Sequence, residues 1–470
     1  MSEEDYKLGE RKPWPTVLLL SLGPFCTNFI WSLSNALISF LVKKAYNEES
    51  VQVLGFSIFV YGIADFMCSF GVASIPICIS KMIAQKKIEE AGQIIADCIR
   101  FSFLICIFTC ATLIPLSKPM LHFLAVPETL ISESCKYIAT TLSLNFITSI
   151  FSSFCCALTV EAKSNLCAIY QVSSILLILA FLSLGFFAFK VSLWASPFFM
   201  HAARFLLVLL LGFQFFKGKF AIKPKFGMLF KKFSSHFPEI LKNSMTQVLT
   251  GFAGVFPPII LIRYTNKAGA NAGKAEETAA VLGSFTLVYN LVSMAVIGLV
   301  QGFNPAAAYA FTKKNYRRVF QLFFAVLIIP FIIEAIITPM MIWKTEALER
   351  IWISNSTNLE YSKKLIPSLY YTNWLYPLSE SFTGLLIATG YGIISIISPI
   401  ARSVGMLIGT FAFYYSSKDR PDLVLLGFGT QDLLLLICSS VCAIIPIKSM
   451  LKSMHTERSE LISMSAELTN

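Results

Sequence analysis

Long apolar stretches, separated by short polar segments, run through the whole chain. Many reach the length of about 18 residues at which an α-helix can cross the roughly 30 Å hydrocarbon core of a bilayer. Helices are predicted near residues 15–42, 52–80, 91–116, 131–158, 164–189, 192–216, 238–262, 279–304, 318–342, 364–389, 391–415 and 423–447. The pattern predicts an all-α membrane protein with twelve transmembrane helices and with both termini on one side.

The two halves of the chain carry the same pattern. From Leu54 the chain reads LGFSIFVYGIADFMCSFGVASIPICISKMIAQKKIEEA, and from Leu282 it reads LGSFTLVYNLVSMAVIGLVQGFNPAAAYAFTKKNYRRV. A shift of 228 positions gives the identical pairs Leu54–Leu282, Gly55–Gly283, Val60–Val288, Tyr61–Tyr289, Val72–Val300 and Lys86–Lys314. Pro76 and Pro305 miss this alignment by one position. A helix, a proline and a basic loop that match together predict two pseudo-symmetric six-helix bundles arranged as a parallel repeat.

Composition supports a membrane protein and narrows its chemistry. The 470 residues are 56% hydrophobic, and their mean hydropathy is +0.68. The net charge of +11 comes largely from basic residues in short loops, where such residues set topology, so it does not predict nucleic-acid binding. Most of the 12 cysteines lie inside apolar stretches and are expected to pack as small apolar side chains.

These patterns divide the chain into five parts: an N-terminal tail (1–14), a first bundle (15–216), a basic linker (217–236), a second bundle (237–447) and a C-terminal tail (448–470). The linker KGKFAIKPKFGMLFKKF mixes lysines with aromatic rings, which suits an anionic membrane surface. A plain topogenic loop explains the same composition equally well. Asp97 and Arg100, near the end of a predicted helix, are expected in the solvated interface.

Basic residues favour the side of the termini, so we expect cytosolic N- and C-termini. The opposite loop carries Asn355-Ser356-Thr357, a glycosylation acceptor pattern that places Asn355 outside if it is used. In the tail, Glu457 followed by Leu461-Ile462 resembles an acidic dileucine sorting signal. The plasma membrane and an endosomal or vacuolar membrane both remain open.

Motifs of enzyme chemistry are missing. The chain has no HExxH, no P-loop glycine run, no G-x-S-x-G and only 4 histidines. We therefore expect no catalytic site, no metal site and no cofactor other than a coupling ion.

Ionisable groups inside predicted membrane helices are the informative residues. A charge at the bilayer centre costs at least about 2.5–3.5 kcal/mol, so each needs a partner or a function. Glu380, Asp65 and Glu334 are candidates to bind a coupling ion or proton. Arg402 lies as far beyond the turn at 390–392 as Glu380 lies before it, so an ion pair between them is the structural alternative.

Neutral polar and aromatic groups in the same helices are candidates to line a cavity. The candidates are Asn35, Ser39, Asn243, Gln247, Thr250, Tyr289, Asn290, Tyr371, Asn373 and Trp374. Asn243, Gln247 and Thr250 recur on one helix face, and the aromatic rings suit flat cationic solutes. Aromatic residues in membrane helices also serve as packing and as interface belts.

The repeated loops carry a family resemblance. SKMIAQKKIEEA in the first half, PAAAYAFTKKNYRRV in the second and Phe237-Pro238 at the start of the second bundle resemble the multidrug and toxic compound extrusion (MATE) transporters. These belong to the multidrug/oligosaccharidyl-lipid/polysaccharide flippase (MOP) superfamily. The resemblance covers nearly the whole length and implies a V-shaped pair of bundles that works by alternating access.

The resemblance also implies a function. It implies a monomeric, proton- or sodium-coupled antiporter that exports cationic or amphipathic xenobiotics and contacts membrane lipids. The stretch LSESFTGLLIATG is similar to the tenth helix of cation-coupled members, where Glu380 matches the cation-site acid. The family's acids in the first and seventh helices are absent: the positions fall at or near Ser39 and on Thr246 or Gln247. A lipid or lipid-linked oligosaccharide flippase, and a membrane enzyme or receptor, are the alternatives.

Overall fold

The computed structural model describes residues 11–468 apart from 73–74, 76–78, 80–86 and 162. Among these, some helical side chains are also not described, chiefly at 242–250, 286–295 and 457–468. Helices dominate the described chain, and no strand occurs in it. Eight of the described helices are long and apolar enough to cross a membrane. The predicted all-α membrane class is confirmed.

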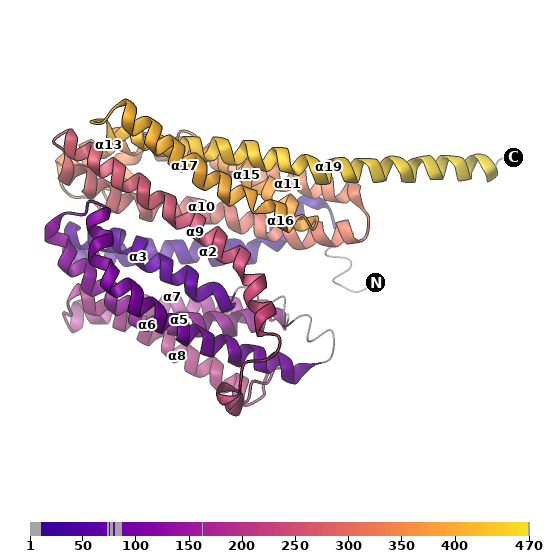
Figure 1. The fold of residues 1–470 in the computed structure, drawn as a ribbon, viewed down its shortest axis with the longest axis horizontal. Coiled ribbons are helices and arrows are strands. Elements are labelled where there is room, and N and C mark those ends of the chain that lie inside the picture. Colours follow the sequence, from indigo (N-terminus) through magenta and orange to yellow (C-terminus); the bar gives the residue numbers. More distant parts are fainter. Residues whose placement is uncertain (1–10, 73–74, 76–78, 80–86, 162, 469–470) are drawn as a thin grey trace.

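Each predicted span overlaps one or more helices of the described chain. The first half contains α2 (Pro13–Ala45), α3 (Glu48–Val72), α5 (Ile88–Phe123), α6 (Glu128–Val160), α7 (Ser164–Ser183), η2 (Leu184–Ala188), η3 (Leu193–Ala195) and α8 (Ser196–Phe216). The linker contains one short turn, η4 (Phe226–Phe230). We call the end where α2 begins the terminal end, because both termini lie there, and the other end the opposite end (Figure 1).

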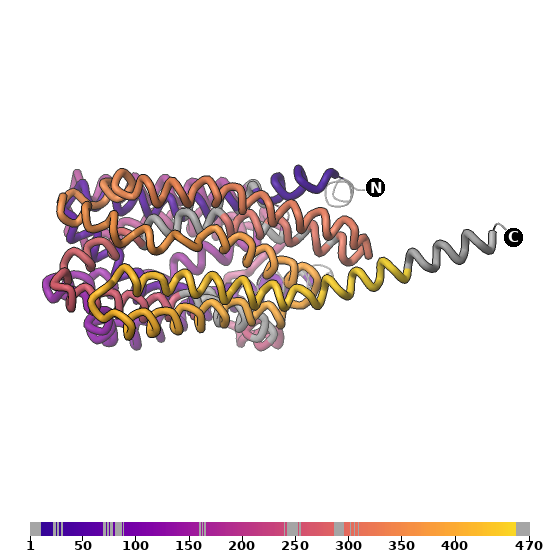
Figure 2. Tube along the Cα trace, turned by 90° about the horizontal axis from the view of Figure 1, so that it is seen from above, coloured from indigo at the N-terminus to yellow at the C-terminus, as the bar shows by residue number. Residues whose placement is uncertain are grey.

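The second half repeats the long helices and adds short ones. It contains α9 (Phe237–Asn271), α10 (Ala275–Thr312), α11 (Tyr316–Trp343), α12 (Thr345–Glu349), α13 (Ser356–Leu365), α14 (Pro367–Tyr370), η5 (Asn373–Leu375), α15 (Tyr376–Ala388), α16 (Gly392–Ser395), α17 (Ile397–Ser416), α18 (Pro421–Val424) and α19 (Gly427–Leu468). Figure 2 shows that the coloured part of α19 already extends past the other helices at the terminal end.

Two predicted spans differ most from the helices of the structure. The span predicted at 364–389 is broken into α13, α14, η5 and α15, because Pro367 and Pro377 each stand in the first turn of a new helix. Proline lacks an N–H and is tolerated best at that position. The last helix runs 21 residues past the predicted boundary at 447, since the sequence up to Leu468 contains neither glycine nor proline.

The two halves meet at a pair of equivalent glycines. A Cβ atom added to Gly55 on α3 would lie 2.3 Å from the backbone oxygen of Gly283 on α10. These two residues are partners in the 228-position repeat, and equivalent positions of a twofold repeat touch only near its axis. The contact therefore places the pseudo-symmetry axis between α3 and α10, where small residues let two helix backbones approach closely.

The first helix of each half crosses to the other half. On α2, Ser21 Oγ donates a 2.8 Å hydrogen bond to the carbonyl oxygen of Leu299 on α10. On α9, the Phe237 ring lies 5.1 Å from that of Phe101 on α5, while Tyr264 lies 4.8 Å from Tyr414 on α17. Figure 1 shows α9 running diagonally from the linker at the terminal end to the second bundle.

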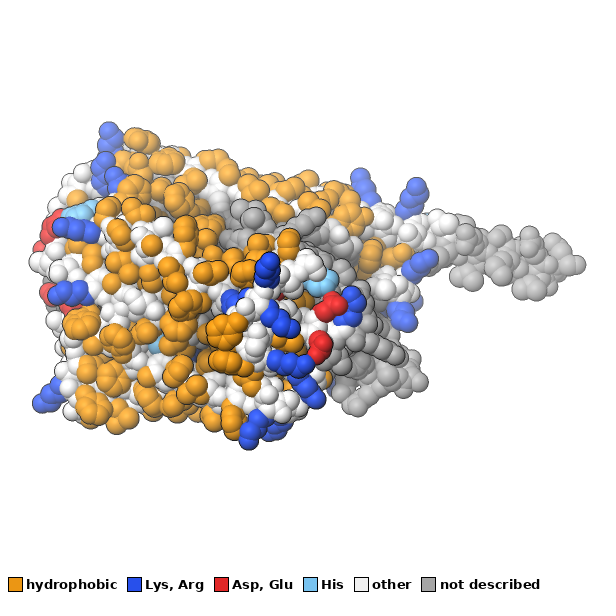
Figure 3. Space-filling model, turned by 60° about the horizontal axis from the view of Figure 1, so that its bottom comes forward, with side chains coloured by type: hydrophobic (Ala, Val, Ile, Leu, Met, Phe, Trp, Pro, Cys, Tyr) orange, Lys and Arg blue, Asp and Glu red, His pale blue; other side chains and the backbone are white. Residues whose placement is uncertain are grey.

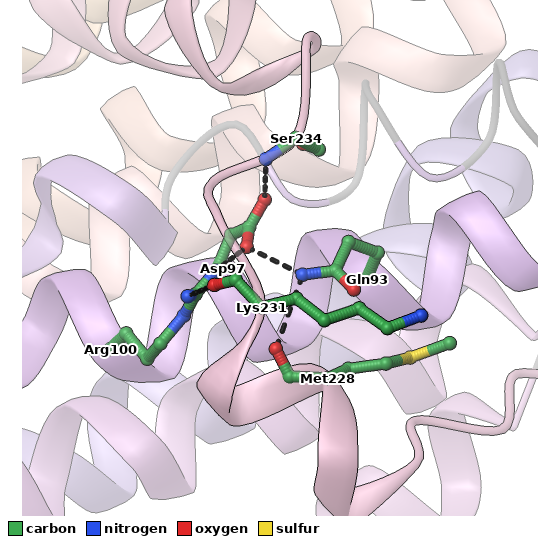
Figure 4. A network of polar contacts seen from close by, with 6 residues as sticks. All are labelled: Gln93, Asp97, Arg100, Met228, Lys231 and Ser234. Atoms are coloured by element: carbon green, nitrogen blue, oxygen red, sulfur yellow. Dashed lines mark hydrogen bonds and ion pairs between the residues drawn. The ribbon is translucent and has the colours of Figure 1, made fainter.

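The linker is fastened to α5 around Asp97 (Figure 4). The Asp97 carboxylate accepts hydrogen bonds from Gln93 Nε2 and from the Ser234 backbone N–H, each 2.9 Å long, and pairs with Arg100. Arg100 also donates to the Lys231 carbonyl oxygen. Asp97 is fully buried, so its predicted place in the solvated interface is wrong. The linker folds over it and replaces water.

Candidate functional site

A buried acid in the second bundle joins two of the predicted site residues. Glu334 on α11 is 1% exposed, and its Oε2 accepts hydrogen bonds from Asn373 Nδ2 at 2.8 Å and from Thr338 Oγ1 at 3.2 Å. Its other oxygen, Oε1, has no hydrogen-bond partner within the described part of the chain. A buried carboxyl with one free oxygen can accept a proton or join the coordination of a cation.

A second buried acid stands beside it and was not predicted. Asp432 on α19 accepts hydrogen bonds from Thr372 Oγ1 at 2.8 Å and from Gln431 Nε2 at 3.2 Å. Thr372 and Asn373 are adjacent, so the break before α15 supplies a hydrogen-bond donor to each of the two acids. The two carboxyl groups also interact electrostatically with each other. The break is thus the element that brings α11 and α19 together around polar groups.

Glu380 and Arg402 lie in the same region of the second bundle. The charge of Arg402 on α17 acts on both Glu380 and Asp432, and Tyr376 donates a hydrogen bond to Glu380. The Arg402 guanidinium lies 5.3 Å from the centre of the Tyr376 ring. One arginine therefore interacts with two acids, so Arg402 is not paired with Glu380 alone. We call Glu334, Glu380, Asp432, Arg402 and their hydrogen-bond partners the second-bundle cluster.

The first bundle holds a smaller polar cluster around Asp65. Asn145 on α6 donates a 2.8 Å hydrogen bond to Asp65 on α3, and Arg204 on α8 donates one of the same length to Thr148. The charge of Arg204 acts on Asp65. Asn145 and Arg204 are buried, but the Asp65 side chain is exposed. These four residues form the first-bundle cluster.

Other predicted lining residues are placed in different surroundings. On α2, Asn35 is half-buried, whereas Ser39 is buried and donates to the Asn35 carbonyl oxygen. Tyr371 and Trp374 are exposed, and the Trp374 indole N–H donates to the Tyr371 carbonyl oxygen. The side chains of Asn243, Gln247, Thr250, Tyr289 and Asn290 lie outside the described residues.

Hydrogen bonds tie the two halves together at the opposite end. Lys43 Nζ donates to the carbonyl oxygens of Arg350 and Ile351, each at 3.1 Å. Glu48 accepts from the backbone N–H groups of Ser354 and Asn355. Asn355 is exposed, and its side-chain oxygen caps α13. In Figure 1 the ribbons of the two halves lie close together here and diverge toward the terminal end.

The same end has a second pair of hydrogen bonds between the two halves, and a cavity beside them. Arg263 and Asn266 on α9 donate to the carbonyl oxygens of Phe123 and Leu124, which are among the last on α5, at 2.7 and 3.0 Å. Such terminal carbonyls have no partner inside their own helix, so a side chain of the other half satisfies them. A cavity of about 310 Å³ lies beside these residues. It is lined by helix-end residues of both halves and belongs to neither polar cluster.

One buried acid lies outside the membrane-spanning helices, also at the opposite end. Glu349 on α12 is 1% exposed and accepts a 2.8 Å hydrogen bond from Ser284 Oγ. Burial raises the pKa of Glu349 to about 7, because the charged form loses its hydration, while the Ser284 bond opposes this rise. Among the described residues, no group of three or more His, Cys, Asp or Glu side chains is arranged to hold a metal ion.

Comparisons with known proteins agree with this arrangement. Residues 25–184 match the family model MatE, and no curated protein sequence matches the chain. The fold is similar to the inward-facing conformation of a multidrug resistance MATE family transporter of the MOP superfamily, at 15% identity and a TM-score of 0.78. That alignment covers 92% of this chain and 99% of the other.

Two further structures are similar over most of their length. The outward-facing conformation of a multidrug resistance MATE family transporter aligns at 16% identity and a TM-score of 0.74, covering 96% of this chain and 99% of that one. The other is a MOP superfamily transporter from Pyrococcus furiosus Vc1 (DSM3638), in which a reverse polarity of the binding pocket suggests a different function. It aligns at 15% identity and a TM-score of 0.75, covering 96% of this chain and 98% of that one. The MatE match lies in the first half of the chain, and the fold shared with these transporters extends over both halves.

Proposed function

We propose that the chain is a secondary active transporter that exports cationic, amphipathic solutes in exchange for protons or sodium ions. The observation that carries the proposal is the charge of its two polar clusters. They contain four acids, namely Asp65, Glu334, Glu380 and Asp432, against the two arginines Arg204 and Arg402. An excess of acidic groups at membrane depth favours cations over anions.

Asp65 is the first choice for the coupling site in the first bundle. A group that loads and releases a proton or a cation must be reached by water, and Asp65 is the exposed acid of its cluster. Asn145 holds the carboxylate in place through one hydrogen bond and leaves its other oxygen to a ligand. Arg204 favours the charged form at rest, so proton or cation binding would weaken that interaction.

Glu380 is the corresponding choice in the second bundle. It is half-buried, and it shares the charge of Arg402 with Asp432. Substrate or ion binding at Glu380 would release Arg402 toward Asp432. If the pair were purely structural, Glu380→Gln would destabilise the protein and the additional change Arg402→Gln would restore it, because a lone buried charge costs more than the absent pair.

The exchange would proceed by alternating access. The ties at the opposite end and the divergence of the ribbons toward the terminal end support an inward-facing state, with cytosolic termini. The higher TM-score to the inward-facing structure, 0.78 against 0.74, agrees with this assignment. Export would then require the Lys43 and Glu48 contacts to break as the opposite end opens.

The test is uptake of ethidium, a fluorescent cation, into proteoliposomes that contain the purified chain. An imposed pH or sodium gradient should drive accumulation against the ethidium gradient, and collapse of that gradient by an ionophore should stop it. Gradient-independent exchange of a fluorescent phospholipid between leaflets, without ethidium uptake, would favour the flippase alternative. Absence of both activities in protein-containing vesicles would contradict a transporter of cations or lipids.

A further inference from the structure

The linker carries aromatic rings that continue the lipid-facing side of α8. Exposed apolar residues follow one side of α8 down to its terminal end: Phe205, Leu206, Leu209, Leu210, Phe213 and Phe216. The Phe216 ring lies 6.1 Å from that of Phe226, which lies 5.7 Å from that of Phe230. Phe226 and Phe230 are 66% and 79% exposed. We call Phe213, Phe216, Phe226 and Phe230 the aromatic row.

Lysines flank this row. Lys217 places its ammonium group 4.3 Å from the centre of the Phe213 ring, and Lys231 and Lys232 follow Phe230 directly. All three are exposed, whereas Lys225 is paired with Glu89 at 2.5 Å. Figure 3 shows Lys and Arg side chains gathered among hydrophobic ones toward the terminal end of the face that it presents. Cationic groups around exposed rings match an anionic, partly apolar partner.

The linker packs against α5 in one orientation, so that some of its side chains are buried and others are exposed. Phe220, Ile222 and Met228 point inward and are at most 5% exposed. The Asp97 network holds Lys231 and Ser234 on α5, and a Cβ added to Gly92 would lie 2.9 Å from the Lys223 carbonyl oxygen. This packing fixes which side chains can face outward, so the exposure of the aromatic row is built into the fold.

We propose that the aromatic row and the flanking lysines bind anionic phospholipids in the leaflet on the side of the termini. The rings continue the hydrocarbon-facing surface of α8, so they reach the level where acyl chains meet headgroups. Lys217, Lys231 and Lys232 then meet the phosphate and carboxylate groups of lipids such as phosphatidylserine. Each lysine near such a surface contributes about fivefold in affinity.

Native mass spectrometry of the detergent-purified full chain tests the proposal directly, because lipid adducts can be counted without regard to membrane orientation. Wild type should bind phosphatidylserine more tightly than phosphatidylcholine. The double change Lys231→Gln/Lys232→Gln should raise the apparent Kd for phosphatidylserine roughly 25-fold and leave phosphatidylcholine nearly unchanged. The matched control is Lys448→Gln/Lys452→Gln, which removes two exposed lysines from the terminal end of α19 and should change the Kd less than about twofold.

A second variant separates the rings from the charges. Phe226→Ser/Phe230→Ser should weaken both lipids to a similar extent, because the rings contact the apolar part that the two lipids share. Inorganic phosphate at the same concentration should not displace phosphatidylserine, which distinguishes a lipid site from a site for a free anion. Equal loss in the α19 control, displacement by phosphate, or an unchanged phosphatidylserine Kd in the Lys231/Lys232 variant would each overturn the proposal.

If a variant fails to fold, the wild-type protein alone still tests whether lysines bind the lipid headgroup. Its preference for phosphatidylserine over phosphatidylcholine should shrink strongly between about 50 and 500 mM ammonium acetate, because salt screens exposed charges. A preference that ignores salt would contradict a lysine-based headgroup site.

Discussion

The two polar clusters use the same kind of residue in different ways. In the first bundle, Asp65 is exposed and held by one amide donor, whereas in the second bundle Glu334 and Asp432 are at most 3% exposed and each has two donors. An exposed acid can exchange a ligand with water as it stands. The buried acids must first be uncovered, and until then they hold α11, α19 and the segment before α15 together.

This difference shows what the duplication kept and what it changed. The repeat preserves the contact geometry, since Gly55 and Gly283 occupy equivalent positions and touch. It does not preserve the chemistry, since the equivalent of Asp65 is Ser293. The bundles are therefore alike as packed helices and unlike as ion sites.

The largest expected effect on transport comes from removing the Asp65 charge. Asp65→Asn should lower gradient-driven ethidium uptake roughly tenfold or more, a loss equivalent to about 1.4 kcal/mol or more of stabilisation during turnover. The unfolding temperature in detergent should stay within error of wild type, because the side chain is exposed and an amide can still accept from Asn145. Normal uptake by this variant would remove Asp65 from the coupling site.

Truncation of the buried acid Glu334 should instead lower the stability of the protein. Glu334→Ala leaves the buried Asn373 amide without its acceptor, which should cost about 1–3 kcal/mol of stability. Thermal unfolding in detergent measures this loss, and Asp65→Asn, which keeps an acceptor for the buried Asn145 amide, is the matched control on the exposed side of the comparison. Adding Asn373→Ala to Glu334→Ala should recover part of the loss, and failure to do so would mean that the contact is not what holds this region.

The shared contact at the axis should be sensitive to a single methyl group. Gly55→Ala forces backbones apart at a helix crossing and should cost about 1–3 kcal/mol, as overpacking does elsewhere. Gly62 lies on the same helix with nothing within 4 Å of an added Cβ, so Gly62→Ala should be neutral or slightly stabilising. Equal unfolding temperatures for the two variants would refute a close contact between the halves at this point.

A pH-dependent effect on stability alone is expected for Glu349, which belongs to neither cluster. Its pKa rises on folding from the ordinary 4.5 to about 7, so the folded state binds this proton more tightly than the unfolded state does. The resulting stability is fully present below about pH 4.5 and is lost as the pH rises through 7. Glu349→Gln should remove this dependence and be more stable than wild type at pH 8, by up to the order of 3 kcal/mol. Parallel pH curves for wild type and variant would contradict the assignment.

The fold was largely predictable because it depends on local patterns. Apolar stretches mark the helices, Gly390 takes the positive φ of 84° that the predicted hairpin turn requires, and the repeat pairs Gly55 with Gly283. The break of the tenth span was missed although Pro367 and Pro377 signal it. Prolines also occur inside unbroken helices, such as Pro330 and Pro339 in α11, so proline alone does not predict a break.

The site was less predictable, because its contacts join residues far apart in sequence. Glu334 and Asn373 were both candidates, but nothing in the sequence indicates that they bind each other. Asp432 is not among the sequence candidates, and it stands near the start of an apolar stretch, where an acid is usually solvated. The sequence predicts a solvated interface for Asp97 because it lies near a helix end, and the linker that covers it is visible only in three dimensions.

The most direct test of the central claim is whether substrate movement drives an ion the other way. Ethidium added to proteoliposomes without any imposed gradient should cause protons or sodium ions to cross in the opposite direction, measured with an internal pH dye or with radioactive sodium. The account predicts such counterflow in wild type and its loss in Asp65→Asn. Ethidium entry without movement of either ion in wild type, or full counterflow in Asp65→Asn, would contradict it.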